Sequence, residues 1–359
     1  MKFEIVHDVP IEKWESYILE HPKGNIFHTP EMFEVFKQTK NYEPYIFFGV
    51  DKETKKIIVL LSSAWVNIGN SLLSKLTSRS IFFGGLVADE TEIAEEALTE
   101  GLKIHDQIMK GRSLFAEIRN RGDSSNHKSL LERNRYGYVD DLTYIIDLKR
   151  NENDIFRSFS SDRRNNIRKA EKKGVIVKEI DSVSQVPIFY DIINTVYRKK
   201  KVPLADISLF ENCFRFLFKR GMFKIFLAQY GTEWIGGHAV LLFKNHILAW
   251  YGGTVEQWST FHPNEMLWWH VIKWGISSGF HTLDLGGAGK PGKPYGPRDY
   301  KARFGGQLVN YGRYLNVYSP ALFKLADISY QIYQKYSKRL ELFNFHHGLS
   351  SQAESLRNT

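Results

Sequence analysis

The sequence predicts an α/β protein in which one mixed α/β unit occurs twice. The length of 359 residues suggests two domains. Runs rich in β-branched and aromatic residues alternate with helical patterns, which favours mixed sheets that are covered by helices. Two stretches of the chain also repeat the same order of elements at a constant offset, as expected for a duplicated domain.

The first copy begins with two β-rich runs around the polar turn Asp51–Thr54, and the second with two runs around Tyr230–Glu233. Each copy continues with an aromatic strand that ends in Gly-Gly, at residues 84–85 and 252–253, and then with a helix. A further strand follows at residues 114–118 and 282–285. An offset of 168 residues relates the two Gly-Gly pairs, and the same offset relates the two later strands. We therefore expect two mixed units of hairpin, strand, helix and strand, with mostly antiparallel sheets.

The two connecting helices support this division. Residues Glu92–Met109 place apolar side chains on one face, whereas Asn264–Ser278 is apolar on nearly all sides and is expected to be buried. The sequence DLKRNEND interrupts a β run near residue 150. We place an N-terminal domain at residues 1–149 and a C-terminal domain at 150–345, ending in a long helix over 320–345, with a polar tail at 346–359.

The composition limits the classes of partner and site. The net charge of +9 favours polyanionic partners, namely nucleic acid, nucleotide-sugars or an anionic membrane surface. The apolar runs are shorter than the roughly 18 residues that span a bilayer, and the N-terminus lacks an apolar signal core, so we expect a cytoplasmic protein. The single cysteine, Cys213, excludes an internal disulfide, and its apolar neighbours predict a buried thiol. No zinc-binding pattern occurs, so no metal is expected.

The segment LDLGGAGKPGKPYGPRDYKARFGG, residues 283–306, resembles two kinds of nucleotide-binding loop. Glycines at 287, 289 and 292 spell G-x-G-x-x-G, but this fingerprint needs a helix directly after the glycines to hold a pyrophosphate. Prolines at 291, 294 and 297 disfavour a helix through this region. A proline also stands where a P-loop needs a Ser or Thr hydroxyl. We therefore expect a strand that leads into a glycine- and proline-shaped loop without a nucleotide.

Two segments are strongly cationic. The loop after the predicted strand suits an anionic substrate, although a solvated basic loop would have the same composition; its cations are Lys290, Lys293, Arg298, Lys301 and Arg303. The segment RSFSSDRRNNIRKAEKK, residues 157–173, is predicted to form a helix that is capped near Ser160 and ended by Gly174. Its cations are either an exposed surface without a specific role or contacts to a diphosphate or a tRNA backbone, with Arg163, Arg164, Arg168 and Lys169 as candidates.

The order of these motifs resembles the FemABX-type acyltransferases, a family that includes the peptidoglycan bridge aminoacyltransferases. The segments that carry the resemblance are RRNNIRKAEKKGV, YRKKKVP, AWYGGT, HPNEMLWWHVIKWGISSGFHTLDLGG and YKARFGG. It is strong over residues 150–310 and weaker over 1–149. It implies two tandem GNAT-like domains, which have the acyl-CoA N-acyltransferase fold, and this agrees with the duplication found from the repeat.

The resemblance implies transfer of an aminoacyl or acyl group to an amine of a cell-envelope precursor. In one version aminoacyl-tRNA is the donor, and a UDP-sugar-peptide or a lipid-linked precursor is the acceptor. In a second version acyl-CoA modifies an amino sugar of an envelope polysaccharide. The coiled-coil arm of some bridge enzymes and the R/Q-x-x-G-x-G/A signature of ordinary acetyl-CoA enzymes are both missing here. A third, non-catalytic reading is a protein that binds a polyanion or the anionic inner face of a membrane.

The resemblance also implies where the chemistry lies. Lys301 in YKARFGG matches the family lysine that stabilises the developing oxyanion, with Tyr300 in place of the usual phenylalanine. We expect Asp284 to accept a proton, to orient Lys301 or to bind loop amides. His262 is either a base or the cap of the helix that follows it. No cofactor is expected to remain bound.

Further candidates would bind the substrates. Tyr251 could line the acceptor pocket by stacking or through its hydroxyl, and Gly286 and Gly287 would let the backbone approach a ligand closely. Arg198 and Lys199 are candidates for contact with an acceptor phosphate or carboxylate.

Overall fold

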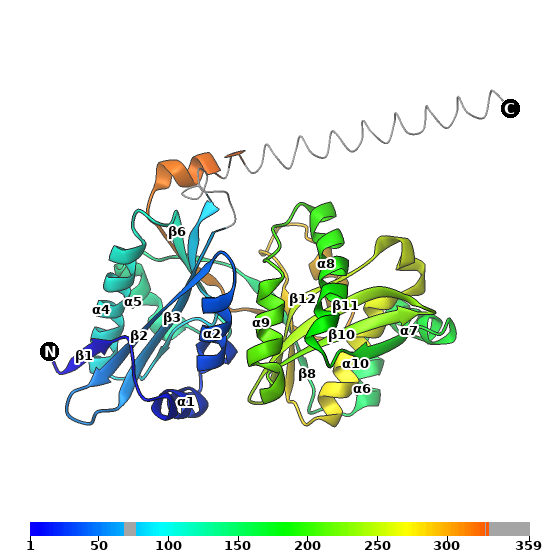
Figure 1. The fold of residues 1–359 in the computed structure, drawn as a ribbon, viewed down its shortest axis with the longest axis horizontal. Helices are drawn as coiled ribbons and strands as arrows, with labels where there is room; N and C mark the ends of the chain where they lie inside the picture. Colours follow the sequence, from blue (N-terminus) through cyan, green and yellow to red (C-terminus); the bar gives the residue numbers. More distant parts are fainter. Residues whose placement is uncertain (68–76, 327, 330–359) are drawn as a thin grey trace.

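The computed structural model describes residues 1–67, 77–326 and 328–329. Most of the predicted C-terminal helix and the whole predicted tail lie outside the described residues. Two mixed sheets stand side by side, one built mainly from the N-terminal half of the chain and the other mainly from the C-terminal half (Figure 1). Within the described part of the chain, no helix is both long enough and apolar enough to cross a bilayer.

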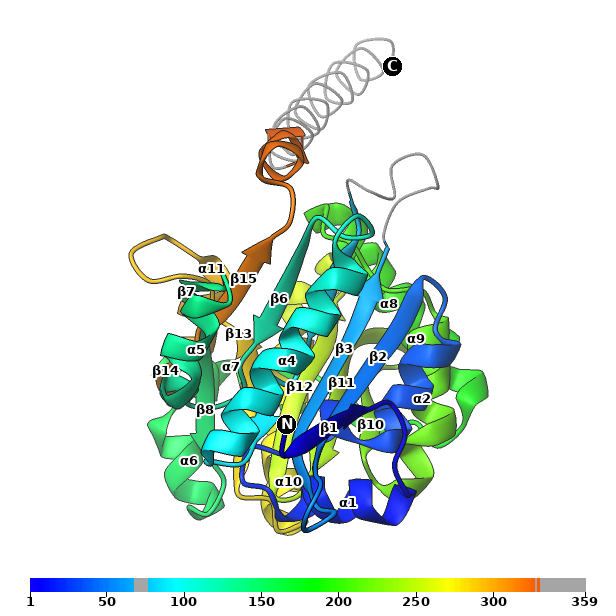
Figure 2. The ribbon, with the colours of Figure 1, turned by 90° about the vertical axis from the view of Figure 1, so that its left-hand side faces the viewer.

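The first sheet is built mainly from the N-terminal half. Its strand order is β1 (Phe3–Val6), β2 (Tyr42–Asp51), β3 (Ile57–Val66), β4 (Arg79–Phe82), β6 (Phe115–Arg119), β15 (Arg313–Val317) and β7 (Gly137–Val139), with β5 (Val87–Ala88) beside β3. Helix α4 (Glu92–Met109) crosses one face, as Figure 2 shows. Further α-helices in the described part of this half are α1 (Ile11–Glu20), α2 (Pro30–Gln38) and α5 (Lys128–Arg133).

The second sheet is built mainly from the C-terminal half. Its strand order is β14 (Gln307–Asn310), β8 (Leu142–Asp147), β13 (Thr282–Gly287), β12 (His246–Thr254), β11 (Glu233–Phe243), β10 (Phe223–Tyr230) and β9 (Ile176–Glu179). Helices α6 (Glu152–Ser158), α7 (Ser161–Lys172) and α10 (Pro263–Ser277) share one hydrophobic core with this sheet. Helices α8 (Val186–Lys200) and α9 (Ser208–Phe216) pack with α2 in a core between the two halves.

The duplication predicted from the repeat is confirmed in the strand register. In the first sheet β4 and β6 run parallel, and Ser80 pairs with Ala116. In the second sheet β12 and β13 run parallel, and Leu248 pairs with Asp284. The second pair lies 168 residues after the first at both positions. The remaining ladders are antiparallel, so the sheets are mixed and mostly antiparallel, as expected.

The helix predictions are accurate where the hydrophobic period is clear. Helix α4 has the predicted bounds, and α10 begins one residue earlier than predicted, with Pro263 in its first turn. Cys213 is fully buried on α9, as its apolar neighbours predicted. Burial raises the pKa of its thiol, which keeps it protonated and unreactive.

Two strands pair in a sheet that belongs mainly to the half of the chain across the predicted boundary between residues 149 and 150. Strand β8 precedes that boundary, yet it pairs with β13 and β14 in the second sheet. Strand β15 follows it, yet it pairs with β6 and β7 in the first sheet. Each sheet therefore borrows a strand from the other half of the chain. The exchange follows from ladder bonds between residues far apart in the sequence, which local patterns do not encode.

Candidate active site

The parallel ladder of the second sheet ends where a cavity begins. Strands β12 and β13 pair only up to Leu248 and Asp284, and their continuations then line a cavity of about 750 Å³. Glycines form both walls at this point, Gly252 and Gly253 on β12 and Gly286 and Gly287 on β13. Because glycine has no side chain, a ligand in the gap could reach backbone groups directly.

Helix α11 (Gly296–Ala302) brings Lys301 into this cavity. Its Nζ donates hydrogen bonds to the carbonyl oxygens of Gly286 at 2.9 Å and Gly287 at 2.8 Å. An ammonium group has three donors, so one N–H remains for a ligand. Burial lowers the pKa of Lys301 to about 8, although the carboxylates of Asp284 and Asp141 act in the opposite direction.

This helix differs from the prediction. The prolines at 291 and 294 lie in a non-helical loop, as expected, but Pro297 occupies the first turn of α11. A proline is tolerated there because the amide of a first-turn residue has no partner within the helix. The loop is tied to the helix by Arg298, whose guanidinium donates to the carbonyl oxygens of Lys290 and Lys293. Arg298 thus holds the loop in place and is not among the residues that line the Lys301 cavity.

Asp284 contacts the same backbone turn whose carbonyl oxygens accept hydrogen bonds from Lys301. Its Oδ1 accepts hydrogen bonds from the Thr143 hydroxyl and, at 2.7 Å, from the amide of Gly286. Its Oδ2 lies 3.8 Å from Nη1 of Arg121. The carboxylate therefore fixes the turn whose carbonyls hold Lys301. Of the roles expected for Asp284, these contacts favour binding of loop amides and orientation of Lys301.

Several of the sequence candidates line the same cavity as Lys301, and others do not. Those in the lining are Tyr251, Lys199, Gly286, Gly287 and Tyr300. Lys199 forms an exposed ion pair with Glu256. Arg198, the neighbour of Lys199, is exposed and lies outside the lining.

His262 occupies the N-cap position of α10, but its side chain makes no capping hydrogen bond, and it does not line the cavity. It adopts a left-handed backbone conformation with φ of 55° directly before the first residue of the helix. Burial lowers the pKa of its imidazole, and nearby cations such as Lys173 act in the same direction. The side chain of His262 thus neither caps the helix by a hydrogen bond nor reaches the cavity where a base would act.

Arg163 is buried, which contradicts its expected place on a phosphate-binding surface. It lies on the same face of α7 as Ile167 and Ala170, whose side chains are also buried. Its guanidinium forms an ion pair with Glu265 of α10 and lies 3.9 Å from the centre of the Tyr300 ring. Arg163 thus anchors the helix that carries Lys301.

The other cations of α7 have different surroundings. Arg164 donates to the carbonyl oxygens of Arg157 and Phe159, which fixes the turn before the helix. Arg168 and Lys169 are exposed, and Arg168 lies over the ring of Phe156. Lys172, at the end of the helix, is exposed as well.

Sequence reasoning missed His238 and Asn264, which also line the cavity, and His238 pairs with Gly252 in the β11–β12 ladder. Nε2 of His238 lies 2.8 Å from Oδ1 of Asn264, and the imidazole packs on Trp268. Burial lowers the pKa of His238 to about 4, so the ring is neutral near pH 7. The surrounding sequence, GGHAVLLF, reads as a buried strand and gave no signal of a polar pair.

Sequence reasoning also missed a polar cavity of about 280 Å³ between the two halves. It shares Tyr251, Gly286 and Gly287 with the Lys301 cavity, and its cations are Arg79, Arg119, Arg121 and Arg313. Burial alone would raise the pKa of Glu117, but Arg119 and Arg313 lower it to about 2. No sequence pattern joins these arginines, because the borrowed strand β15 brings Arg313 to them. Among the described residues, no cluster of acidic, histidine or cysteine side chains could hold a metal ion.

Comparison with known proteins finds similar sequences and similar folds. Residues 157–302 match the family described as Acetyltransferase (GNAT) domain. The chain is 23% identical over 229 residues to a Lipid II:glycine glycyltransferase of Staphylococcus aureus (strain COL), which covers 61% of this chain. A solved structure of FemX matches with a TM-score of 0.67 and 16% identity, over 90% of this chain and 99% of FemX.

The chain is similar to FemABX-type proteins.

Other solved structures share the fold of this FemABX-like chain. L-PGS from Bacillus licheniformis matches with a TM-score of 0.54 and 15% identity, over 87% of this chain and 93% of L-PGS. A tandem GNAT protein from the clavulanic acid biosynthesis pathway also has a TM-score of 0.54, with 9% identity over 89% of this chain and 99% of that protein. The FemABX-like chain spans about half of the glycyltransferase it matches, namely 53% of its length.

Proposed function

We propose that this FemABX-like chain transfers an aminoacyl or acyl group from an activated ester or thioester to an amine of a cell-envelope precursor. The observation that carries the proposal is the partly buried ammonium of Lys301, held by two backbone carbonyls at the end of the β12–β13 ladder. A fixed cation in a partly desolvated site is suited to stabilise negative charge that develops on a carbonyl oxygen.

The reaction proceeds through attack of a neutral amine nitrogen on the carbonyl carbon of the donor. A C–N bond forms, the carbonyl oxygen becomes an oxyanion beside Lys301, and the C–O or C–S bond to the donor then breaks. The proton lost by the amine neutralises the departing alkoxide or thiolate. Lys301 remains an ammonium throughout, so its role is electrostatic.

The arginine-rich cavity supports a phosphate-bearing acceptor. Arg79 and Arg119 lie beside Tyr251, next to the Lys301 cavity, and Nε of Arg79 is buried without a hydrogen-bond partner among the described residues. Guanidinium groups bind phosphate oxygens in a bidentate manner. A UDP-sugar-peptide or a lipid-linked precursor would supply a diphosphate to this cavity and an amine to Lys301. A lipid-linked acceptor would bring the protein to the inner membrane face.

The donor of the first version is an aminoacyl-tRNA, which the exposed cations Arg168 and Lys169 would help to hold through phosphate contacts. The similarity to a protein named Lipid II:glycine glycyltransferase supports aminoacyl transfer. The test is incubation of the purified protein with charged tRNA and candidate precursors, followed by mass spectrometry of the precursor. Transfer that survives digestion of the tRNA by ribonuclease would reject this donor.

Acyl-CoA is the second candidate donor, and the match of residues 157–302 to the GNAT domain family favours it. An acyl-CoA enzyme would modify an amino sugar of an envelope polysaccharide. Thermal stabilisation by CoA esters but not by tRNA would select this version. A purely binding role, for a polyanion or a membrane surface, predicts that Lys301→Ala leaves the biological function unchanged.

A further inference from the structure

The N-terminal half contains a cavity at the position that corresponds to the Lys301 cavity. The β4–β6 ladder ends at Phe82 and Ile118, and the segments that follow line a cavity of about 420 Å³. Gly84 and Gly85 stand in its wall, 168 residues before Gly252 and Gly253 of the second cavity. The duplicated unit has therefore formed a pocket twice, at the same end of its parallel strand pair.

The two cavities differ in their side chains. The N-terminal cavity is walled largely by apolar residues of both halves, including Phe27, Leu131, Leu241 and Phe243. Its volume lies within the range of about 300–1,000 Å³ that is usual for small-molecule sites. Lys301 does not line it, so this cavity lacks the ammonium on which the proposed transfer depends.

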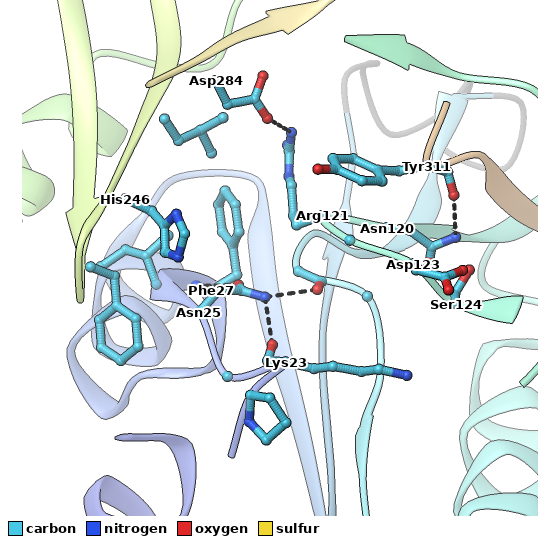
Figure 3. Close-up of a pocket in the computed structure, with 18 of the residues that line it drawn as sticks. Lys23, Asn25, Phe27, Asn120, Arg121, Asp123, Ser124, His246, Asp284 and Tyr311 are labelled. Carbon is cyan, nitrogen blue, oxygen red and sulfur yellow. Dashed lines mark hydrogen bonds and ion pairs between the residues drawn. The ribbon is translucent and has the colours of Figure 1, made fainter. Parts of the chain in front are cut away.

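The guanidinium of Arg121 is a strong hydrogen-bond donor that borders this cavity and has few polar partners. Arg121 lines the cavity, and about 27% of its side chain is accessible. Its polar contacts are long: Nε lies 3.4 Å from the carbonyl oxygen of Phe83, and Nη1 lies 3.8 Å from Oδ2 of Asp284. Figure 3 shows the guanidinium between the rings of Phe27 and Tyr311, pointing toward Asp284. A guanidinium has five N–H donors, so most of those of Arg121 are available to a ligand.

The charged side chains that line the cavity indicate which kind of anion it would bind. Asp123, Asp284 and Lys23 also line the cavity, so a dianionic phosphate would meet two carboxylates beside the cations Arg121 and Lys23. A monoanionic carboxylate matches the planar fork of a single arginine and leaves the acidic groups less perturbed. The apolar walls would take the rest of such a molecule. His127, which is buried in the same lining with Nε2 unpaired among the described residues, adds a further polar group.

We propose that the cavity at the end of the β4–β6 ladder is a second ligand site, and that it binds a small carboxylate with an apolar or aromatic body. The carboxylate accepts hydrogen bonds from Arg121, and the apolar body lies against Phe27 and Leu131. This site shares Arg121 with the arginine-rich cavity, but binding of a carboxylate here does not require the transfer reaction proposed above.

The test uses 4-fluorophenylacetate as the probe and 4-fluorophenylacetamide as its neutral isostere, with binding to the full chain followed by ¹⁹F NMR. The carboxylate is expected to bind about tenfold more tightly than the amide, since only the carboxylate forms charge-assisted hydrogen bonds. Arg121→Gln should remove this preference. Gly122→Trp should block the cavity, because a side chain built at Gly122 has open space around its Cβ and residue 122 stands in the lining.

Three controls make the result specific. Arg133→Gln removes an exposed cation of the same half and should leave binding unchanged. Arg79→Gln removes a cation of the arginine-rich cavity and should also leave it unchanged. Lys301→Ala should bind the probe like the unmodified chain, so loss of transfer activity would not alter this readout. Equal binding of the amide, absence of probe binding, or binding that is lost with Arg79→Gln but kept with Gly122→Trp would overturn the proposal.

Discussion

The guanidinium of Arg163 lies 3.9 Å from the centre of the Tyr300 ring, and the next residue in the chain is Lys301. Arg163 is also ion-paired with Glu265, and side-chain exposure is 9% for Arg163 and 8% for Glu265. This contact joins α7 and α10 to the short helix that carries the candidate catalytic lysine. A residue from the most cationic helix of the chain thus acts as an internal anchor.

Replacing Arg163 by glutamine is expected to destabilise the protein by about 3–5 kcal/mol, because the Glu265 carboxylate would remain buried without its partner. Urea denaturation measures the change in the free energy of unfolding. Lys169→Gln, on the exposed side of the same helix, should stay within about 0.5 kcal/mol of the unmodified chain. The double variant with Glu265→Gln should recover part of the loss, since no unpaired charge is left. Equal stability of the Arg163 and Lys169 variants would contradict an anchoring role.

Replacing Lys301 by alanine is expected to lower kcat about 10²- to 10³-fold with a smaller effect on KM, as for removal of one oxyanion donor. The reason is that Lys301 is proposed to interact with charge that develops only in the transition state. Single-turnover measurement of the transferred group provides the readout. Lys290→Ala, in the exposed loop before α11, removes a nearby cation and should leave kcat almost unchanged. A Lys301→Ala protein with normal kcat would exclude the proposed mechanism.

The sequence predicted those parts of the fold that depend on local periodicity. Helices α4 and α10 and the paired ladders of the repeat follow from the spacing of apolar residues and from the Gly-Gly pairs. The exchange of β8 and β15 could not be predicted in this way, because their partners are set by contacts across the whole chain. The arginine-rich cavity depends on that exchange, since Arg313 reaches it on β15.

The candidate site was predicted in part for a similar reason. Lys301 and its glycine partners came from one contiguous motif, and the structure brings them together. His238 and Asn264 belong to different elements, and neither carries a local signal. For Arg163 a signal was present, because its spacing of four and seven residues from Ile167 and Ala170 places it on the buried face of the helix.

The lowered pKa of Lys301 predicts how transfer activity changes at alkaline pH. Lys301 has a pKa of about 8, so it carries its charge below that value and loses it as the pH rises through it. The neutral amine cannot stabilise an oxyanion, so kcat should fall about tenfold per pH unit well above pH 8. In Lys301→Arg the alkaline decline should disappear, because a guanidinium stays protonated throughout this range. A decline that persists in the arginine variant would have to arise from another group.

Asp284→Asn separates the two catalytic roles that remain for this residue. The asparagine oxygen can still accept the hydrogen bond from the Gly286 amide, so the turn that holds Lys301 should keep its shape. The negative charge of Asp284 raises the pKa of Lys301, and its removal should therefore move the alkaline decline of kcat to lower pH. Asp299→Asn, which removes an exposed carboxylate from α11 itself, is the matched control and should move the decline less. A large loss of kcat with the alkaline decline at its original pH would instead indicate that Asp284 accepts the proton of the attacking amine.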